Sequence, residues 1–302
     1  MPINASTRIC AVYGHPIKHS ASPAMQNAGI AALGLDWRYL ACEVHPENLA
    51  TALAGAKAMK FLGLNLTVPH KLLAFSMVDA LDDSAKMWGA VNTVRFEGKN
   101  KSNEWMPLAQ LPADDILEIR SHGFNTDADA ITQSLKEDLE IQLRGSSVLL
   151  LGAGGAGRVA ALKLAAEGAA NLFLVNRTKK KAEEIGKEIE ARYPGTRVTI
   201  GYPKATVDLL LNATSLGLKT GDESPVDENE FPLSNARAVY DMIYRPAETQ
   251  LLAAAKKAGC RTANGIGMLL YQGAKALELW SGKPAPIETM RRALEENVYG
   301  KQ

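Results

Sequence analysis

The sequence has few cysteines, no marked charge imbalance and no long apolar run. Its 302 residues include 3 cysteines, Cys10, Cys42 and Cys260, none in C-x-x-C spacing, which is typical of a reducing compartment. A formal net charge of +1 gives no electrostatic case for nucleic acid or a membrane as partner. No segment approaches the roughly 18 apolar residues of a membrane span, and the opening MPINASTR lacks a signal-peptide core. We therefore expect a cytoplasmic protein.

Histidine is also scarce, with 5 in the chain. His15 and His19 are four residues apart, but Pro16 lies between them and no third ligand is near in sequence. A zinc site normally needs at least three protein ligands. We expect no metal site.

The chain length predicts two domains. The first part alternates between expected strands and helices; the strands are 8–14, 36–43, 61–67 and 90–96, and the helices 22–34, 46–59 and 70–81. Such alternation indicates an α/β fold with a mostly parallel sheet. A second α/β unit follows, with strands at 207–214 and 238–243, and helices at 267–280 and 286–298 close the chain. We expect domains at 1–127 and 128–265, followed by C-terminal helices at 266–302.

The segment VLLLGAGGAG, residues 148–157, carries the strongest single motif. An apolar strand leads into a glycine-rich turn and then a helix, the context of a dinucleotide-binding turn. Gly152 would permit the tight turn, Gly154 and Gly155 the approach of a pyrophosphate, and Gly157 the packing of helix on strand. The candidate cofactor-binding positions are Gly152, Ala153, Gly154, Gly155, Ala156 and Gly157. The alternative is a glycine turn needed only for packing.

The next strand bears on the choice of nucleotide. An NAD site has an acidic residue about 20 residues further on, where it binds the ribose hydroxyls. Here the chain reads NRTKKKAEE, with Asn176 nineteen residues after Gly157 and Arg177, Thr178 and Lys181 beside it. Cations at the start of a helix oppose its dipole, so a 2′-phosphate among them is expected, and hence NADP. The alternative is a solvated basic surface.

Polar side chains follow the expected strands of the first part. They are Ser20 and Ser22, then Asn65, Thr67 and Lys71, then Asn92 and Thr93, and finally Asp127. Ligands of open α/β sheets bind at the carboxyl ends of strands. Each residue alone has a simpler interpretation: Ser22 as a helix cap, Lys71 as a surface cation, Asn92 in a turn. Together they indicate a small, polyhydroxylated anion as ligand.

The order of these motifs is similar to that of the shikimate dehydrogenase family, almost from end to end. The motifs are GHPIKHSASP, GLNLTVPHK, GAVNT, NTD, LGAGGAG, NRT, NATS, DMIYRP and NGIGMLLYQG. The resemblance implies an α/β substrate domain, a Rossmann-type NADP-binding domain and C-terminal helices that return to the first domain. It also implies reversible, NADP-dependent reduction of 3-dehydroshikimate to shikimate, on the chorismate route to aromatic amino acids.

The resemblance also implies roles for individual residues. Lys71 and Asp127 match the catalytic pair, Ser20 and Ser22 the positions that bind the substrate carboxylate. The remaining substrate positions are Asn65, Thr67, Asn92, Tyr244 and Gln272. Asn176, Arg177, Thr178 and Lys181 match the adenosine-phosphate pocket, and the other cofactor positions are Thr214, Met242, Gly265 and Met268. A lysine ammonium near the carbonyl oxygen would stabilise negative charge and could donate a proton; which member of the pair is the formal acid stays open.

Three features depart from the family pattern. Gln26 stands where a histidine is usual, Ala128, Asp129 and Ala130 replace the usual glycines after NTD, and residues 94–122 are much longer than the usual hairpin. We interpret Gln26 as a packing change. Asp129 either caps the next helix or stiffens the domain junction. The long segment is either a surface elaboration or a lid or subunit contact.

Three alternatives stay open. One is a quinate/shikimate dehydrogenase that uses NAD, and another is a paralogue acting on a related cyclohexane carboxylate. The third is a non-catalytic NADPH-binding regulator, which would have no need of both Lys71 and Asp127. A homodimer is also left open by the sequence.

Overall fold

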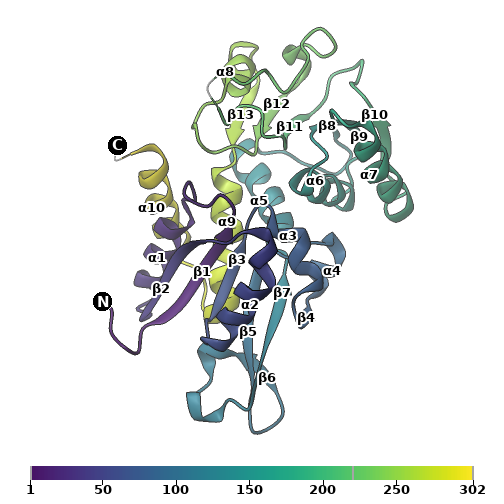
Figure 1. Cartoon of the computed structure of the whole chain (residues 1–302). Helices are drawn as coiled ribbons and strands as arrows, with labels where there is room; N and C mark the ends of the chain where they lie inside the picture. Colours follow the sequence, from purple (N-terminus) through teal and green to yellow (C-terminus); the bar gives the residue numbers. More distant parts are fainter. Residues whose placement is uncertain (1, 220, 301–302) are drawn as a thin grey trace. The chain divides into compact units, whose positions relative to one another are not determined.

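The structure, a computed structural model, describes residues 2–219 and 221–300, which form two compact units (Figure 1). Unit 1 contains the chain up to Asp127 and from Leu270 onward, and unit 2 contains Ala128–Leu269. Unit 1 is therefore assembled from two stretches of sequence separated by the whole of unit 2. Within the described residues, no helix has the length and apolar character needed to cross a membrane.

The sheet of unit 1 has the order β2-β1-β3-β5-β7-β4, with β6 paired to β5. Its strands are β1 (Arg8–Gly14), β2 (Trp37–Glu43), β3 (Gly63–Leu66), β4 (Ala80–Leu81), β5 (Thr93–Lys99), β6 (Trp105–Pro107) and β7 (Glu118–Phe124). The expected mostly parallel sheet is confirmed with one exception, since β5 runs antiparallel to β3, β6 and β7, whereas the pairs β1–β2, β1–β3 and β4–β7 are parallel. The chain between β5 and β7 contains no α-helical crossover. Two parallel strands would normally need one, so β5 and β7 run antiparallel.

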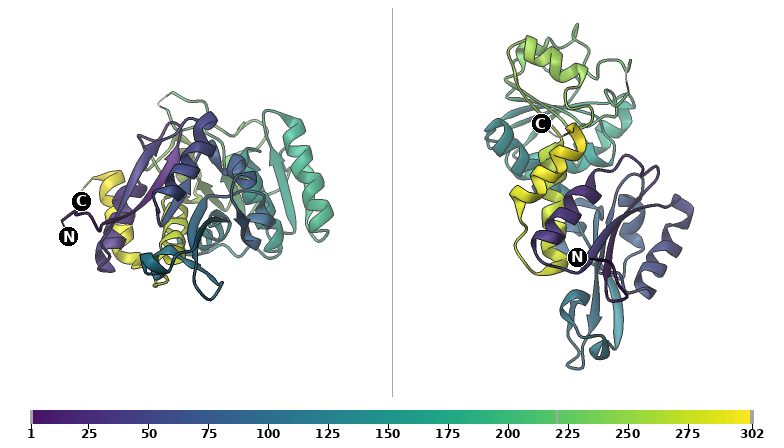
Figure 2. Two further views of the ribbon diagram at one scale, coloured as in Figure 1. Left: turned by 60° about the horizontal axis from the view of Figure 1, so that its bottom comes forward. Right: turned by 90° about the vertical axis from the view of Figure 1, so that its left-hand side faces the viewer.

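The helices of unit 1 come from both ends of the chain. They are α1 (Ser22–Ala32), η1 (Pro46–Asn48), α2 (Leu49–Ala58), α3 (His70–Leu73), η2 (Ala74–Ser76), α4 (Asp83–Trp88), η3 (Leu108–Gln110), η4 (Ala113–Asp115), most of α9 (Ile266–Ser281) and α10 (Ile287–Tyr299). Helices α1 and α10 lie side by side (Figure 2). A Cβ atom at Gly29 would come within 2.8 Å of Leu277 and 3.0 Å of Met290, so glycine permits the close contact of α1 with α9 and α10.

The expected helix over 70–81 is only partly formed. The chain forms α3 and η2, and then turns into the short strand β4, which is followed by the unexpected α4. The Asp79 carboxylate accepts hydrogen bonds from the backbone N–H and hydroxyl of Ser121, at 2.7 and 2.8 Å. Asp82 accepts a bond from the N–H of Ser84 and caps α4. The Asp79–Ser121 bonds attach this segment to β7 and stabilise its strand conformation against the local helical preference.

Unit 2 contains an entirely parallel sheet with the order β10-β9-β8-β11-β12-β13. The strands are β8 (Ser147–Leu151), β9 (Asn171–Val175), β10 (Arg197–Ile200), β11 (Leu209–Asn212), β12 (Ala238–Asp241) and β13 (Arg261–Asn264). The helices are α5 (Asp127–Leu139), α6 (Gly155–Ala166), α7 (Lys179–Arg192), η5 (Leu233–Asn235) and α8 (Gln250–Lys257). This strand order is that of dinucleotide-binding Rossmann folds. The predicted α/β class is confirmed; the edge strands β10 and β13 were not expected.

Residues 99–117 form an extension of the unit 1 sheet. Strand β6 pairs with β5, and a Cβ atom at Gly98 would lie 2.8 Å from Leu111, 3.1 Å from Leu108 and 3.3 Å from Ile116. Leu108 is completely buried. The segment therefore has its own small apolar core.

Candidate active site

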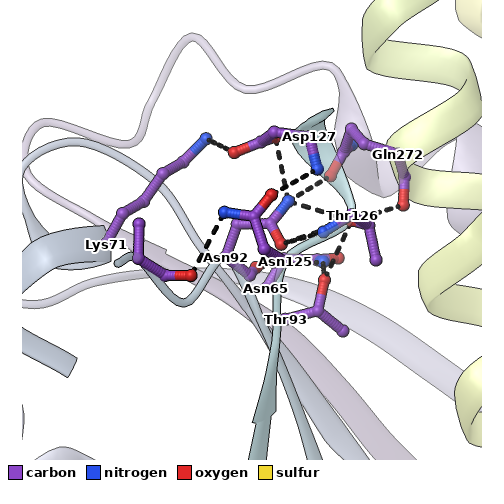
Figure 3. A network of polar contacts seen from close by, with 9 residues as sticks. Asn65, Lys71, Asn92, Thr93, Asn125, Thr126, Asp127 and Gln272 are labelled. Carbon is purple, nitrogen blue, oxygen red and sulfur yellow. Dashed lines mark hydrogen bonds and ion pairs between the residues drawn. The ribbon is translucent and has the colours of Figure 1, made fainter. Parts of the chain in front are cut away.

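The central feature of unit 1 is an ion pair between Lys71 and Asp127 (Figure 3). Lys71 Nζ lies 2.7 Å from Asp127 Oδ2. The Asp127 side chain is 8% exposed and that of Lys71 is 30% exposed. The Asp127 side chain is thus enclosed by protein, while the Lys71 side chain stays partly exposed. An amine and a carboxylate 56 residues apart in sequence meet in one place.

The antiparallel direction of β5 explains this convergence. Asn65 on β3 pairs with Thr93 on β5, which pairs with Phe124 on β7. The beginning of β5 therefore lies beside the ends of β3 and β7, where the chain continues to Lys71 and Asp127 respectively. Side chains from one strand start and two strand ends meet at one edge of the sheet.

Asn92 organises the carboxylate. Its Nδ2 donates to Asp127 Oδ1 and to Thr126 Oγ1, both at 2.9 Å, and its Oδ1 accepts from the backbone N–H of Thr126 at 2.8 Å. Asn92 is 1% exposed. Both carboxylate oxygens of Asp127 consequently have a partner, one from Asn92 and one from Lys71, which compensates for the cost of burying the charge.

Gln272 joins this network from α9. The Thr126 hydroxyl donates to the Gln272 carbonyl at 3.1 Å, and Asn92 Nδ2 lies 3.5 Å from Gln272 Oε1. Gln26, one turn into α1, is fully buried and donates through Nε2 to the Gly273 carbonyl at 2.8 Å. The departure at position 26 therefore supports the packing of α1 against α9, next to Gln272.

Asn65 completes the polar cluster on the β3 side. Its Nδ2 donates to Thr93 Oγ1 at 3.0 Å, and its Oδ1 accepts from the Tyr39 hydroxyl at 2.7 Å. Ser22 is buried and is the first residue of α1, not its N-cap as the sequence suggested; the N-cap is Ala21. Ser20 and Thr67 are half-buried in the loops after β1 and β3. Tyr244 belongs to unit 2, in the loop after β12.

The glycine-rich turn of unit 2 joins β8 to α6. Gly152 has φ of +104°, which side-chain-bearing residues rarely adopt. A Cβ atom at Gly157 would lie 2.2 Å from the carbonyl oxygen of Gly152, whereas a Cβ atom at Gly154 or Gly155 would meet nothing within 4 Å. The turn thus needs glycine at two positions for its own geometry, and it leaves open space at the N-terminus of α6. That space suits a pyrophosphate.

The residues after β9 form a basic, exposed group. Asn176 Oδ1 accepts from the N–H of Ala153 at 2.9 Å, which attaches this loop to the glycine-rich turn. Arg177 and Lys181 are exposed, and within the described part of the chain neither forms an ion pair. The first turn of α7 contains no acidic residue. The charges and the open turn fit a dinucleotide that carries an extra phosphate.

The ends of three adjacent strands bring the remaining cofactor candidates together. Asn212, Asp241 and Asn264 are in register on β11, β12 and β13. Met242 and Gly265 are the next residues after Asp241 and Asn264, and Thr214 lies two residues after Asn212. A Cβ atom at Gly265 would lie 2.1 Å from the Met242 carbonyl oxygen. Met268 is half-buried in the first turn of α9.

Three site-shaping residues were not singled out from the sequence. Thr126 lies inside the NTD motif, so the motif itself was the signal. Asp241 accepts hydrogen bonds from Asn212 Nδ2 at 3.0 Å and from Thr249 Oγ1 at 2.7 Å; burial raises the pKa of its carboxyl although these bonds oppose the shift. Tyr39 belongs to no motif.

Asp129 Oδ1 lies 2.8 Å from Lys163 Nζ on α6, so this departure links α5 to the helix that follows the glycine-rich turn. Among residues 2–219 and 221–300, no group of three or more His, Cys, Asp or Glu side chains could hold a metal ion.

Three family models match the chain. The shikimate dehydrogenase substrate binding domain matches residues 12–94, shikimate / quinate 5-dehydrogenase matches 133–215, and the shikimate 5′-dehydrogenase C-terminal domain matches 265–295. The shikimate dehydrogenase (NADP(+)) of Methanopyrus kandleri is 38% identical over 304 residues, which cover 98% of this chain and 98% of that protein. The chain belongs to the shikimate dehydrogenase family.

Solved structures of this family have the same fold. A shikimate dehydrogenase in complex with NADP+ has a TM-score of 0.82 at 33% identity and covers 98% of both chains. The enzyme from Thermus thermophilus in complex with NADP(H) and shikimate has a TM-score of 0.79 at 34% identity, over 96% of this chain and all of that one. The quinate dehydrogenase of Corynebacterium glutamicum in complex with NAD is less similar in sequence, with a TM-score of 0.78 at 26% identity over 95% and 98% of the two chains.

Proposed function

We propose that this chain catalyses the reversible, NADP-dependent reduction of 3-dehydroshikimate to shikimate. The observation that carries the proposal is the Lys71–Asp127 pair at 2.7 Å, joined through Asn92 to a network of amides and hydroxyls. A binding protein does not require a partly exposed lysine held by an enclosed carboxylate. An enzyme that moves a proton to and from an oxygen does.

Substrate recognition is assigned to the polar cluster of unit 1. Ser20 and Ser22 would bind the carboxylate, while Asn65, Thr67, Asn92 and Gln272 would contact the ring hydroxyls. Tyr244 is a separate candidate for substrate binding and belongs to unit 2. The amides of Asn65 and Asn92 are almost fully buried and held by several partners. Pre-oriented polar groups of this kind bind a hydroxylated ring with little loss of side-chain entropy.

The cofactor residues are assigned to unit 2. Gly152, Ala153, Gly154, Gly155, Ala156 and Gly157 would hold the pyrophosphate, and Asn176, Arg177, Thr178 and Lys181 the adenosine ribose and its 2′-phosphate. Thr214, Met242, Gly265 and Met268 would line the nicotinamide side. When bound, NADPH supplies a hydride to the carbonyl carbon of the substrate.

Side chains of unit 1 would stabilise the charge that this reaction creates. Negative charge develops on the carbonyl oxygen, and the Lys71 ammonium can stabilise it and provide a proton. Asp127 holds the ammonium group in place through Oδ2. Asn92 in turn holds Asp127, because its Nδ2 donates to Asp127 Oδ1 at 2.9 Å. In the oxidative direction, the same pair accepts the proton of the substrate hydroxyl. We treat the two groups as one coupled proton donor and acceptor.

A direct assay tests this function. Purified protein is mixed with shikimate or quinate and with NADP+ or NAD+, and absorbance of the reduced nicotinamide is followed. The proposal requires shikimate with NADP+ to give the highest kcat/KM of the four pairs. A higher value for quinate with NAD+ would assign the chain to the alternative function represented by the quinate dehydrogenase, and no turnover with any pair would favour a non-catalytic NADPH-binding regulator.

Two further assignments accompany this function. We propose a cytoplasmic location, which the free thiols of Cys10, Cys42 and Cys260 favour. A homodimer is the proposed assembly to test, by light scattering coupled to gel filtration.

A further inference from the structure

Tyr39 on β2 is a fully buried tyrosine whose hydroxyl contacts a candidate substrate-binding side chain, that of Asn65. It is 1% exposed, and its hydroxyl donates to Asn65 Oδ1 at 2.7 Å. Burial raises the pKa of Tyr39 well above its usual value, and the nearby Cys10 adds to this. The phenol therefore keeps its proton and remains a hydrogen-bond donor.

The position of Tyr39 explains why a tyrosine is needed. Tyr39, Cys10 and Gly63 are in register on the neighbouring strands β2, β1 and β3. Asn65 lies two residues beyond Gly63, on the same face of the sheet. The hydroxyl must therefore pass over β1 to reach a strand about 10 Å away. A long, rigid side chain such as a phenol can do this with the loss of few rotatable bonds.

The ring of Tyr39 is held firmly. Its centroid lies 6.1 Å from that of Trp280 on α9, and the Trp280 indole N–H donates to the Val94 carbonyl at 3.0 Å. The backbone of Tyr39 is bound on both sides by the Asn27 amide, at 2.9 Å to its N–H and 2.8 Å to its carbonyl. These contacts hold the Tyr39 hydroxyl in a fixed position.

This hydroxyl decides how Asn65 is presented. Asn65 Oδ1 faces Tyr39, while Nδ2 faces Thr93 Oγ1 at 3.0 Å and the Asn92 carbonyl at 3.4 Å. The Asn92 carbonyl can only accept, so a flipped amide would place two acceptors together. Without the Tyr39 hydroxyl, Oδ1 loses its donor in a buried site, and the amide is free to turn or shift to find another.

We propose that Tyr39 is a positioning residue that holds the Asn65 amide in the orientation needed to recognise a ring hydroxyl of the substrate. Asn65 is the candidate contact for that hydroxyl, so the phenol acts on substrate recognition through its bond to Asn65. This inference depends on the proposed function. Since Tyr39 does not contact Lys71 or Asp127 through any hydrogen bond recorded in the described residues, it should affect substrate binding much more than the chemical step.

The test is the Tyr39→Phe variant, which removes the hydroxyl and keeps the ring against Trp280. We expect KM for shikimate to rise about tenfold. This change corresponds to the loss of one buried hydrogen bond and of the fixed orientation that it gives the Asn65 amide. Both kcat and KM for NADP+ should stay within about twofold of the wild type. An unchanged KM for shikimate, or an equal fall of kcat and kcat/KM, would overturn the proposal.

A matched control separates positioning from stability. Tyr240 on β12 is also fully buried, and its hydroxyl is 2.9 Å from Ser134 Oγ in unit 2. Tyr240→Phe should lower the melting temperature by a similar amount but leave KM for shikimate within about twofold of the wild type. A rise of KM in this control equal to that of Tyr39→Phe would make the effect one of stability and refute the inference.

A double-mutant cycle with Asn65→Ala identifies the partner. If Tyr39 acts mainly through Asn65, adding Tyr39→Phe to Asn65→Ala should change KM by less than about twofold, whereas independent effects would multiply. A crystal structure of Tyr39→Phe supplies a readout that does not require turnover. If the wild type failed to oxidise shikimate or quinate, the proposed function would fall, and an unmoved Asn65 amide in that structure would refute the Tyr39 inference separately.

Discussion

The candidate sites of the two units are constructed by opposite means. In unit 1, side chains from several elements hold one another, as in the sequence of contacts from Lys71 to Asp127 and Asn92. In unit 2, the backbone itself forms the site, through the positive φ of Gly152 and the contact of Gly157 with the Gly152 carbonyl. Loss of a single polar group should therefore impair the site of unit 1, whereas added side-chain volume at a glycine should impair the site of unit 2.

The largest effect is expected from Lys71→Ala. Loss of the ammonium group should lower kcat by about 10²-fold or more, since a general acid contributes this much, while NADPH binding should remain because it depends on unit 2. Steady-state kinetics and NADPH fluorescence titration measure the two effects. Lys86→Ala, which removes an exposed lysine paired with Asp83, is the control. A nearly normal kcat for Lys71→Ala would contradict the catalytic assignment.

A second prediction concerns Glu97, a buried charge of unit 1 remote from catalysis. Burial raises its pKa, but bonds from His122, Arg95 and Arg120 together outweigh this and lower the pKa to about 2. The unfolded chain therefore binds more protons than the folded one between about pH 2 and 4.5, and the stabilisation is present above this window and lost as pH falls through it. At pH 7 it amounts to at most about 3 kcal/mol.

Urea unfolding of Glu97→Gln at pH 7 and at pH 3 tests this. The variant should be less stable than the wild type at pH 7, and the difference should shrink at pH 3. A difference in unfolding free energy that did not depend on pH would contradict the assignment of the Glu97 charge to stability. Activity at pH 7 measured well below the melting temperature should change little, in contrast to Lys71→Ala.

The backbone site of unit 2 predicts a contrast between two glycines. Gly157→Ala places a Cβ atom 2.2 Å from a backbone oxygen and should destabilise the protein by about 2 kcal/mol. Gly155→Ala meets open space and should leave the free energy of unfolding unchanged or slightly higher, because alanine favours the helix. Its effect should instead be weaker NADPH binding. Equal stability of the two variants would refute this division of roles.

The smallest effect is expected at the basic group after β9. Arg177→Ala should lower kcat/KM for NADP+ by about tenfold through loss of a charge-assisted phosphate contact. The value for NAD+ should change by less than about twofold. Lys187→Ala removes an exposed cation further along α7 and serves as the control. An equal loss with both cofactors would argue against a 2′-phosphate at Arg177.

The sequence predicted unit 2 better than unit 1, and the two kinds of site explain why. The turn at 152–157 and the buried strands β8 and β11 follow from continuous local patterns, in which each residue is constrained by its neighbours in the chain. The direction of β5 and the existence of β4 depend on partners far away, such as the Asp79–Ser121 bonds across 42 residues. The spacing of apolar and polar residues within one segment does not contain that information.

The candidate site shows the same division. Lys71 and Asp127 were found because they lie in motifs, and their meeting followed from the general rule for strand ends. Tyr39 was missed because its importance arises only when β2, β1 and β3 are in register and a side chain reaches over the middle strand. Gln26 and Asp129 were noticed as departures, but their partners, Gly273 and Lys163, became visible only in the folded chain.

The discontinuity of unit 1 has a consequence for biosynthesis. Trp280, which occupies the space left by Gly63, and Gln272 both come from the last part of the chain. A ribosome therefore releases β1 to β7 long before the helices that cover them, while unit 2 can condense from one uninterrupted stretch. Nascent chains of this protein should expose the part of the sheet that α9 covers until this helix has been synthesised, and chaperones that recognise such surfaces would act mainly on the N-terminal portion.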